Sequence, residues 1–206
     1  MDVSELDFNR IKSSVSETRI KKSSRYFHKK DRNLSVGVEI LLKHALYKIG
    51  ISDPVFGVDR HSKPYLKNYP DVYFNLSHSG EYVACAVSDS PVGVDIERIH
   101  DIDLNIARHF FYGTEYDYVL NNKDSNKAFF ELWVLKESYM KMTGLGFRLA
   151  LDEFCIEINH EITLMHNENT GNFGLWNVCG GNYMLAVCSQ SEITEPAMIN
   201  LHDIEN

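Results

Sequence analysis

The fold of this chain is decided by the segment Trp133-Val134-Leu135-Lys136-Glu137-Ser138-Tyr139-Met140-Lys141. It lies in a stretch, residues 126–143, that has no glycine or proline and many large apolar residues. This stretch therefore predicts a long helix, which Gly144 and Gly146 end. Trp133, Glu137 and Lys141 recur four residues apart and share one face of this helix. Taken alone, that spacing is more typical of a surface ion pair than of a functional site.

The composition is that of an ordinary soluble globular protein. The residues are 44% hydrophobic and 24% charged. A chain of 206 residues is long enough to bury a sizeable core. No apolar run reaches the roughly 18 residues that span a bilayer, and the acidic start of the chain lacks the apolar core of a secretory signal. Four cysteines without CxxC spacing are typical of reduced thiols rather than of disulfides or a zinc site. We therefore expect a cytoplasmic protein with no membrane partner.

The charge is unevenly distributed. A net charge of −8 argues against general nucleic-acid binding, which usually needs a basic surface. Between Arg10 and Arg32, however, basic residues far outnumber the two acids, Glu17 and Asp31. A local basic patch on an acidic protein suits a small polyanion, although a solvated helix face would have the same composition.

The pattern of elements predicts an α+β protein built from two similar halves. In each half helices come first and antiparallel strands follow, and Gly80-Glu81-Tyr82 is echoed by Gly181-Asn182-Tyr183 before an apolar strand. We expect subdomains at residues 1–100 and 101–206, each with helices packed on an antiparallel sheet and related by a pseudo-twofold axis. Helices are predicted at 35–49, 104–110, 114–120 and 126–143, and strands at 55–58, 72–75, 82–87, 92–97, 154–158, 162–165, 174–178 and 183–188. The short connection 88–91 predicts a hairpin between strands 82–87 and 92–97.

Two acids stand out in Gly93-Val94-Asp95-Ile96-Glu97. In a strand Asp95 and Glu97 project from the same face, while Val94 and Ile96 face the core. A solvated strand face would also carry such a pair. Together with Glu137, however, they would form an oxygen-rich site for a hard cation such as Mg²⁺, or Mn²⁺, and the lack of histidine and thiol disfavours zinc or copper.

A third segment could hold phosphate. Asn75-Leu76-Ser77-His78-Ser79-Gly80 is expected to end a strand in a turn, where exposed amides and an imidazole can bind phosphate oxygens. Upstream, Lys63-Pro64 places a lysine in an extended loop. Either piece alone is more typical of a surface turn than of a site.

The order of these motifs resembles the 4′-phosphopantetheinyl transferases, in particular the Sfp-type branch that activates peptide and polyketide synthetases. The resemblance runs from about Arg19 to Cys188 and is specific in Gly93–Glu97 and in Trp133–Lys141. It implies transfer of the 4′-phosphopantetheine arm of coenzyme A to a serine of an apo peptidyl or acyl carrier protein, with release of adenosine 3′,5′-bisphosphate. The family's usual Gly-Lys-Pro reads Ser62-Lys63-Pro64 here, a departure that concerns the adenine end of the ligand.

The resemblance also implies roles for individual residues. Asp95, Glu97 and Glu137 would hold Mg²⁺, and Glu137 would be the general base, acting directly or through a water on the cation. Lys141 and His78 would contact the pyrophosphate, with Ser77 beside them. The remaining coenzyme A ligands are expected to be Arg19 and Lys22 at the 3′-phosphate and Lys63 and Pro64 at the nucleotide edge.

Two other functions use the same residues. A Mg²⁺-dependent phosphohydrolase of nucleotide pyrophosphates would use the acids with water as nucleophile. A non-catalytic coenzyme A-binding module would need the Lys63 and His78 segments but not three converging carboxylates.

Family carriers are commonly acidic, so we expect an acidic enzyme to dock them through apolar contacts rather than by overall charge. Large apolar residues crowd the segment after the acids, and we expect an exposed member such as Tyr118 to contact the carrier. The crowded residues are Phe110, Phe111, Tyr112, Tyr116, Tyr118 and Leu120. We expect the enzyme itself to be a monomer.

Overall fold

The computed structural model describes residues 1–60, 63–165 and 171–205. The N-terminal half contains α1 (Phe8–Ile11), α2 (Glu17–Ser23), α3 (Lys29–Lys48), β1 (Phe56–Val58), β2 (Pro64–Leu66), β3 (Tyr73–Ser79), β4 (Tyr82–Ser88) and β5 (Val92–Arg98). The C-terminal half contains α4 (Asn105–Phe110), α5 (Gly113–Asn121), α6 (Ser125–Thr143), β6 (Cys155–Ile158), β7 (Ile162–Met165), β8 (Asn172–Val178), β9 (Tyr183–Ser189) and α7 (His202–Glu205).

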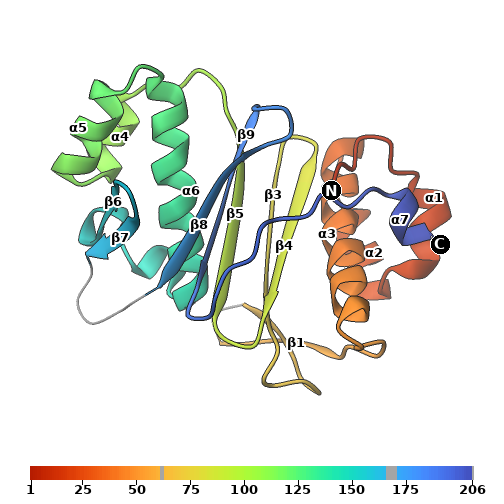
Figure 1. Ribbon diagram of the computed structural model, residues 1–206. Helices are drawn as coiled ribbons and strands as arrows, with labels where there is room; N and C mark the ends of the chain where they lie inside the picture. The colour runs from red at the N-terminus through yellow and green to blue at the C-terminus, as the bar shows by residue number, and fades with distance from the viewer. Residues whose placement is uncertain (61–62, 166–170, 206) are drawn as a thin grey trace.

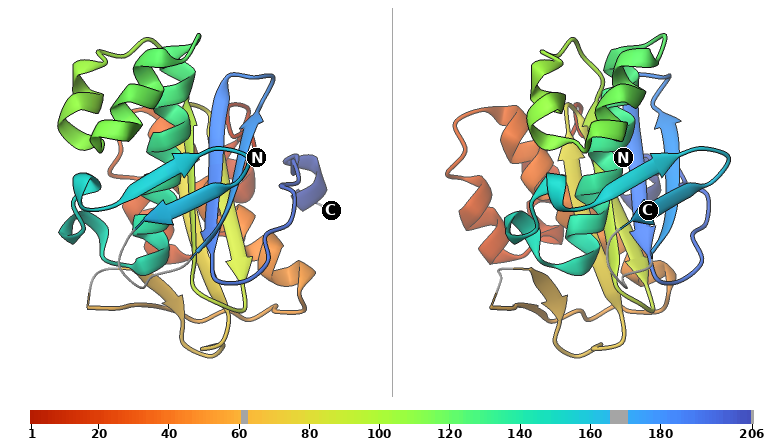
Figure 2. Two further views of the ribbon diagram at one scale, coloured as in Figure 1. Left: turned by 60° about the vertical axis from the view of Figure 1, so that its left-hand side comes forward. Right: turned by 90° about the vertical axis from the view of Figure 1, so that its left-hand side faces the viewer.

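The two long helices enclose two sheets. Helix α6 packs across β5 and β9 on one side of the molecule, and α3 packs against β4 on the other (Figure 1). Between them lie the hairpin β3–β4 and the antiparallel sheet β5-β9-β8. Helices α4 and α5 lie beside one end of α6, and the small hairpin β6–β7 lies near its middle (Figure 2). The predicted α+β class is therefore confirmed.

The order of elements in the two halves repeats. Each half has a long helix, a short antiparallel hairpin (β1–β2 or β6–β7) and then a hairpin of two seven-residue strands (β3–β4 or β8–β9). Strands β4, β5 and β9 contact one another through an apolar layer. This layer includes Ala84, Val94, Ile96 and Leu185. The echo between the segments at Gly80 and Gly181 thus falls at the turns of corresponding hairpins.

The predicted hairpin between strands 82–87 and 92–97 is wrong. Strand β4 pairs with β3, and β5 pairs with β9 instead. Gly80 has a φ of +58°, which allows the tight turn that joins β3 to β4, whereas the 88–91 connection carries the chain from one sheet to the other. Strand β5 is buried from Val92 to Ile96, because β9 pairs along one of its edges and β3 lies along the other.

The segment 75–79 also differs from the prediction. The sequence predicts a strand that ends near Asn75 in a phosphate-binding turn, but β3 continues to Ser79 and is paired with β4 throughout. This segment is therefore an extended strand and not a turn, and it brings its side chains to the site. Helix α3 likewise starts earlier than predicted, at Lys29, because residues 29–34 favour a helix without showing apolar periodicity.

Helix α6 brings the two motifs together. It ends at Thr143 as predicted, with Gly144 in the left-handed conformation after it. A Cβ on Gly93 would lie 1.9 Å from the backbone oxygen of Ser138, so only glycine lets the helix rest directly on β5. This close approach sets Glu137 and Lys141 beside Asp95 and Glu97.

Within the described residues, no helix is both long and apolar enough to cross a membrane.

Candidate active site

Two hollows lie at the junction of the halves. The larger, of about 780 Å³, is lined mainly by apolar residues of β4, β5 and β9 and by the segment 192–199, and contains none of the predicted site residues. The smaller, of about 300 Å³, contains the predicted acids, lysine and histidine. We take the smaller hollow as the candidate site because the predicted charged residues line it together. It is lined by Leu76, Ser77, His78, Asp95, Glu97, Trp133, Glu137 and Lys141.

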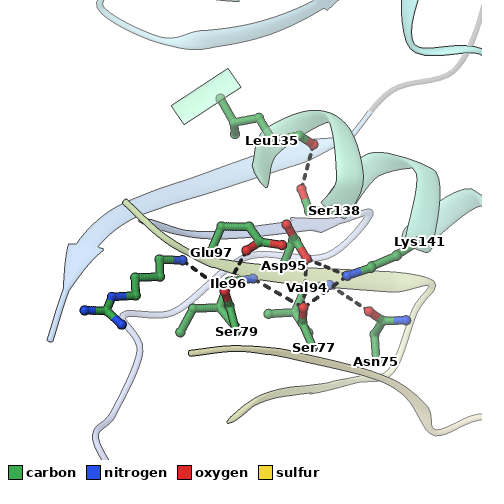
Figure 3. Close-up of polar contacts among 11 residues, drawn as sticks. Asn75, Ser77, Ser79, Val94, Asp95, Ile96, Glu97, Leu135, Ser138 and Lys141 are labelled. Carbon is green, nitrogen blue, oxygen red and sulfur yellow. Dashed lines mark hydrogen bonds and ion pairs between the residues drawn. The ribbon is translucent and has the colours of Figure 1, made fainter. Parts of the chain in front are cut away.

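Strands β3 and β5 run side by side along the floor of this site. They are joined by side chains: Asn75 Oδ1, Ser77 Oγ and Ser79 Oγ accept hydrogen bonds from the backbone N–H groups of residues 94, 96 and 98, over 3.0, 3.4 and 3.1 Å (Figure 3). The serine hydroxyls donate in turn to the acids. Ser77 Oγ donates to Asp95 Oδ1 over 2.8 Å, and Ser79 Oγ donates to Glu97 Oε2 over 2.6 Å.

Lys141 reaches the same carboxylate from the helix. Its Nζ donates to Asp95 Oδ1 over 2.5 Å and to Ser77 Oγ over 3.1 Å. The other oxygen of Asp95, Oδ2, is buried and has no hydrogen-bond partner. A buried carboxylate oxygen without a partner is costly unless a proton or a cation meets it.

The three acids are chemically suited to a cation, although their carboxylates do not meet at one point in this structure. Among the described residues, no three His, Cys, Asp or Glu side chains are placed to ligate one ion as they stand. The unpartnered Oδ2 of Asp95 and two further carboxylates in the same hollow nevertheless form the hard, oxygen-only donor set that Mg²⁺ prefers. The residues present therefore fit the group that the sequence predicts.

The pKa shifts of the three acids also favour a bound cation. Burial raises the pKa of Asp95, although Lys141 and Ser77 oppose this rise. Burial also raises the pKa of Glu97, and burial followed by the charge of Asp95 raises the pKa of Glu137. Each carboxylate is thus harder to ionise than usual, and a bound cation would relieve that cost.

His78 joins this hollow to a basic one. It lines the candidate site and also a neighbouring hollow of about 110 Å³, which contains Arg19 and Lys22. Burial, then the charge of Lys141, lowers the pKa of His78, so its imidazole is neutral near pH 7. Arg19 is held by Glu39, whose Oε2 lies 3.2 Å from its Nε. The predicted 3′-phosphate and pyrophosphate residues thus line adjoining hollows.

Lys63 and Pro64 lie apart from both hollows. Lys63 Nζ donates to the carbonyl oxygens of Lys141 and Met142, over 2.6 and 3.4 Å, at the end of α6. Burial lowers the pKa of Lys63. Pro64 pairs with Val58 at the start of β2, and Ser62 lies outside the described residues.

Two residues with clear contacts here were not assigned by sequence reasoning. Ser79 bonds to Glu97, and the alternation of short polar residues at 75, 77 and 79 was the signal available. Lys136, at the centre of the helix motif, is fully buried and faces away from the hollow. Its Nζ donates to Glu115 Oε1 over 2.6 Å and to the carbonyl of Phe154 over 2.7 Å, so it anchors α6 to α5 and to the start of β6.

The expected carrier surface needs one correction. Tyr118 is half-buried, and its hydroxyl donates to Glu131 Oε2 over 2.7 Å, so it is not the exposed member of the aromatic segment. The exposed ones are Phe110, Tyr112 and Leu120. Phe110 packs edge-on against Trp133, which itself lines the candidate site.

Comparison with known proteins identifies the family of the chain. Residues 91–188 match the family model of the 4′-phosphopantetheinyl transferase superfamily, and residues 2–90 match that of the 4′-phosphopantetheinyl transferase N-terminal domain. The chain is 33% identical over 196 residues to the 4′-phosphopantetheinyl transferase Sfp of Bacillus subtilis, covering 91% of this chain and 87% of that protein. It is 36% identical over 168 residues to the 4′-phosphopantetheinyl transferase gsp of Aneurinibacillus migulanus, covering 79% and 70%.

Among solved structures, the chain is similar to the holo-[acyl-carrier-protein] synthase of Thermotoga maritima, with a TM-score of 0.43, 17% identity, and coverage of 48% of this chain and 62% of that one. The two family models together cover residues 2–188, in both halves of the chain. The chain is a transferase enzyme that belongs to the 4′-phosphopantetheinyl transferase family.

Proposed function

We propose that the enzyme transfers the 4′-phosphopantetheine arm of coenzyme A to a serine of apo peptidyl or acyl carrier proteins in a Mg²⁺-dependent reaction. The observation that carries this proposal is the single hollow shared by Asp95, Glu97, Glu137 and Lys141, which His78 connects to Arg19 and Lys22. A carboxylate-rich hollow beside a basic one matches a substrate with a pyrophosphate and a further phosphate.

Asp95, Glu97 and Glu137 would hold Mg²⁺, or Mn²⁺ in its place. The cation would offset negative charge on the pyrophosphate when it is bound. The unpartnered Oδ2 of Asp95 supports its role as a ligand.

Glu137 is the proposed general base. It takes the proton of the carrier serine as the serine oxygen attacks the β-phosphorus of coenzyme A, the phosphorus nearest the pantetheine. A new oxygen–phosphorus bond forms, the pyrophosphate linkage breaks, and adenosine 3′,5′-bisphosphate leaves. Burial and the charge of Asp95 raise the pKa of Glu137, which makes its carboxylate a stronger base than that of an exposed glutamate.

The basic residues would hold the substrate. Lys141 can donate to the pyrophosphate and stabilise the leaving phosphate, provided that it moves from Asp95. Neutral His78 can donate one hydrogen bond to the pyrophosphate, and Arg19 and Lys22 can meet the 3′-phosphate. We keep Lys63 and Pro64 as candidates for the nucleotide edge, because the Lys63 ammonium lies at the end of the same helix as Lys141.

The proposal includes a cellular location and an oligomeric state. Four free cysteines support a reducing compartment, the cytoplasm. The repeated order of elements supports a single chain that acts as a monomer with two similar subdomains, residues 1–100 and 101–206.

Product release distinguishes the proposed transferase from a phosphohydrolase. Adenosine 3′,5′-bisphosphate should appear only when coenzyme A, Mg²⁺ and an apo carrier are all present. A carrier whose acceptor serine is changed to alanine serves as the control. Release at the same rate without a carrier would instead support the hydrolase.

A second experiment tests whether the protein is instead a non-catalytic coenzyme A-binding module. Glu137→Gln should remove turnover and leave coenzyme A binding, measured by calorimetry, within about threefold of the wild type. Equal turnover by the variant and the wild type would exclude Glu137 as the base.

A further inference from the structure

The hydrogen bonds between β3 and β5 join residues at a constant spacing in the sequence. Residues 75, 77 and 79 of β3 each accept a hydrogen bond from the backbone N–H of the residue 19 positions later, at 94, 96 and 98. The residues 18 positions later are Gly93, Asp95 and Glu97. Asparagine stands opposite the glycine, and serine stands opposite each acid.

The chemistry of the two side chains explains this arrangement. The amide oxygen of Asn75 only accepts, which is sufficient where Gly93 offers no carboxylate. A serine hydroxyl both accepts and donates. Because the Ser79 oxygen already accepts from the N–H of Arg98, its single proton is directed away from that N–H, toward Glu97 Oε2 at 2.6 Å. The chain of bonds from amide to hydroxyl to carboxylate strengthens each member.

We propose that Ser79 is a positioning residue for the cation site: it fixes the orientation of the Glu97 carboxylate through the same hydroxyl that joins β3 to β5. Ser77 has the same relationship to Asp95, with its hydroxyl 2.8 Å from Oδ1. Lys141 is a second donor to Asp95, so Glu97 depends more on its serine than Asp95 does. The inference rests on the proposed function, since it assigns Glu97 to the cation.

Cation binding tests this role without any turnover. Mn²⁺ is titrated into the protein with coenzyme A, and the free Mn²⁺ signal is read by electron paramagnetic resonance after correction for Mn²⁺ bound by coenzyme A alone. Ser79→Ala should weaken Mn²⁺ binding by about 10- to 100-fold, the usual loss when a partner of a metal ligand is removed. Ser79→Thr keeps the hydroxyl and should restore binding to within about threefold of wild type.

Asn75→Ala is the matched control. It removes one bond of the same β3–β5 contact without removing a donor to a carboxylate. Its Mn²⁺ affinity should therefore stay within about twofold of wild type, although its thermal midpoint should fall about as far as that of Ser79→Ala.

Three results would overturn the inference: wild-type Mn²⁺ affinity in Ser79→Ala, an equal loss in Asn75→Ala, or no Mn²⁺ binding by the wild type. The proposed function can fail separately. If no carrier is modified while Ser79→Ala still weakens Mn²⁺ binding, the positioning role stands and the transferase assignment falls.

Discussion

Lys141 Nζ lies 2.5 Å from Asp95 Oδ1, so the last turn of α6 is joined to strand β5 by an ion pair at the edge of the candidate site. The lysine is 28% exposed, whereas the aspartate is almost fully buried at 3%. The lysine can therefore move toward a substrate phosphate, whereas the aspartate is fixed and needs a positive partner.

Asp95→Asn should reduce turnover by about 100-fold or more, because the isosteric amide keeps the packing but removes the charge that meets the cation. Stability should change little, since the partly exposed Lys141 can be hydrated when it loses its partner. Steady-state kinetics and thermal unfolding check the two halves of this prediction. Asp71→Asn, at an exposed carboxylate, is the control. Turnover near that of the wild type would remove Asp95 from the site.

The buried pair Lys136–Glu115 should matter for stability rather than for chemistry. Lys136→Met leaves the Glu115 carboxylate without its ammonium partner in a site with no exposed surface, which should cost about 3–5 kcal/mol. Adding Glu115→Gln should recover part of this loss, because the neutral amide can still accept from the backbone N–H of Ile156. Urea unfolding measures Lys136→Met, Glu115→Gln and the double variant. A double variant less stable than the sum of the single changes would contradict the explanation.

Carrier docking should depend on apolar contact near Tyr112. This side chain is 51% exposed, so Tyr112→Ala should raise KM for the carrier about tenfold and leave KM for coenzyme A nearly unchanged. Tyr47→Ala, on α3 and 69% exposed, should change neither constant. If docking were mainly electrostatic, carrier affinity would instead fall steeply as salt rises to about 0.5 M, with normal kinetics for Tyr112→Ala.

Glu39 gives the fold a dependence on pH. Burial opposes its ionisation, but hydrogen bonds from Ser16 and the charge of Lys43 outweigh burial and lower its pKa from 4.5. A lowered folded-state pKa stabilises the protein above pH 4.5, and that stabilisation is lost as the pH falls through the folded value.

Glu39→Gln should therefore be less stable than wild type by about 1 kcal/mol near neutral pH. The gap should shrink below pH 4.5 in urea unfolding at several pH values. A gap that stays constant or widens on acidification would show that Glu39 is not the group responsible.

Local patterns predicted most elements, and long-range pairing was what they missed. The helix at 126–143 and the strands of the C-terminal half were predicted within a few residues, because apolar periodicity and glycine breaks are local signals. The predicted partner of β5 was wrong because no local pattern marks the true pairing. Asp95 pairs with Ala186 of β9, which lies 91 positions later in the sequence. Asp95 and Glu97 were predicted to share one face because they alternate on a strand, and both line the same hollow. Lys136 was given no role because its partner Glu115 lies on another helix.

Intact-mass analysis of an apo carrier protein incubated with the enzyme, coenzyme A and Mg²⁺ is the most direct test of the transferase assignment. The carrier should gain the mass of one 4′-phosphopantetheine group. The gain should be absent when the acceptor serine is alanine and nearly absent with Glu137→Gln. An unchanged mass for every one of several peptidyl and acyl carriers, with a folded enzyme and Mg²⁺ present, would contradict it.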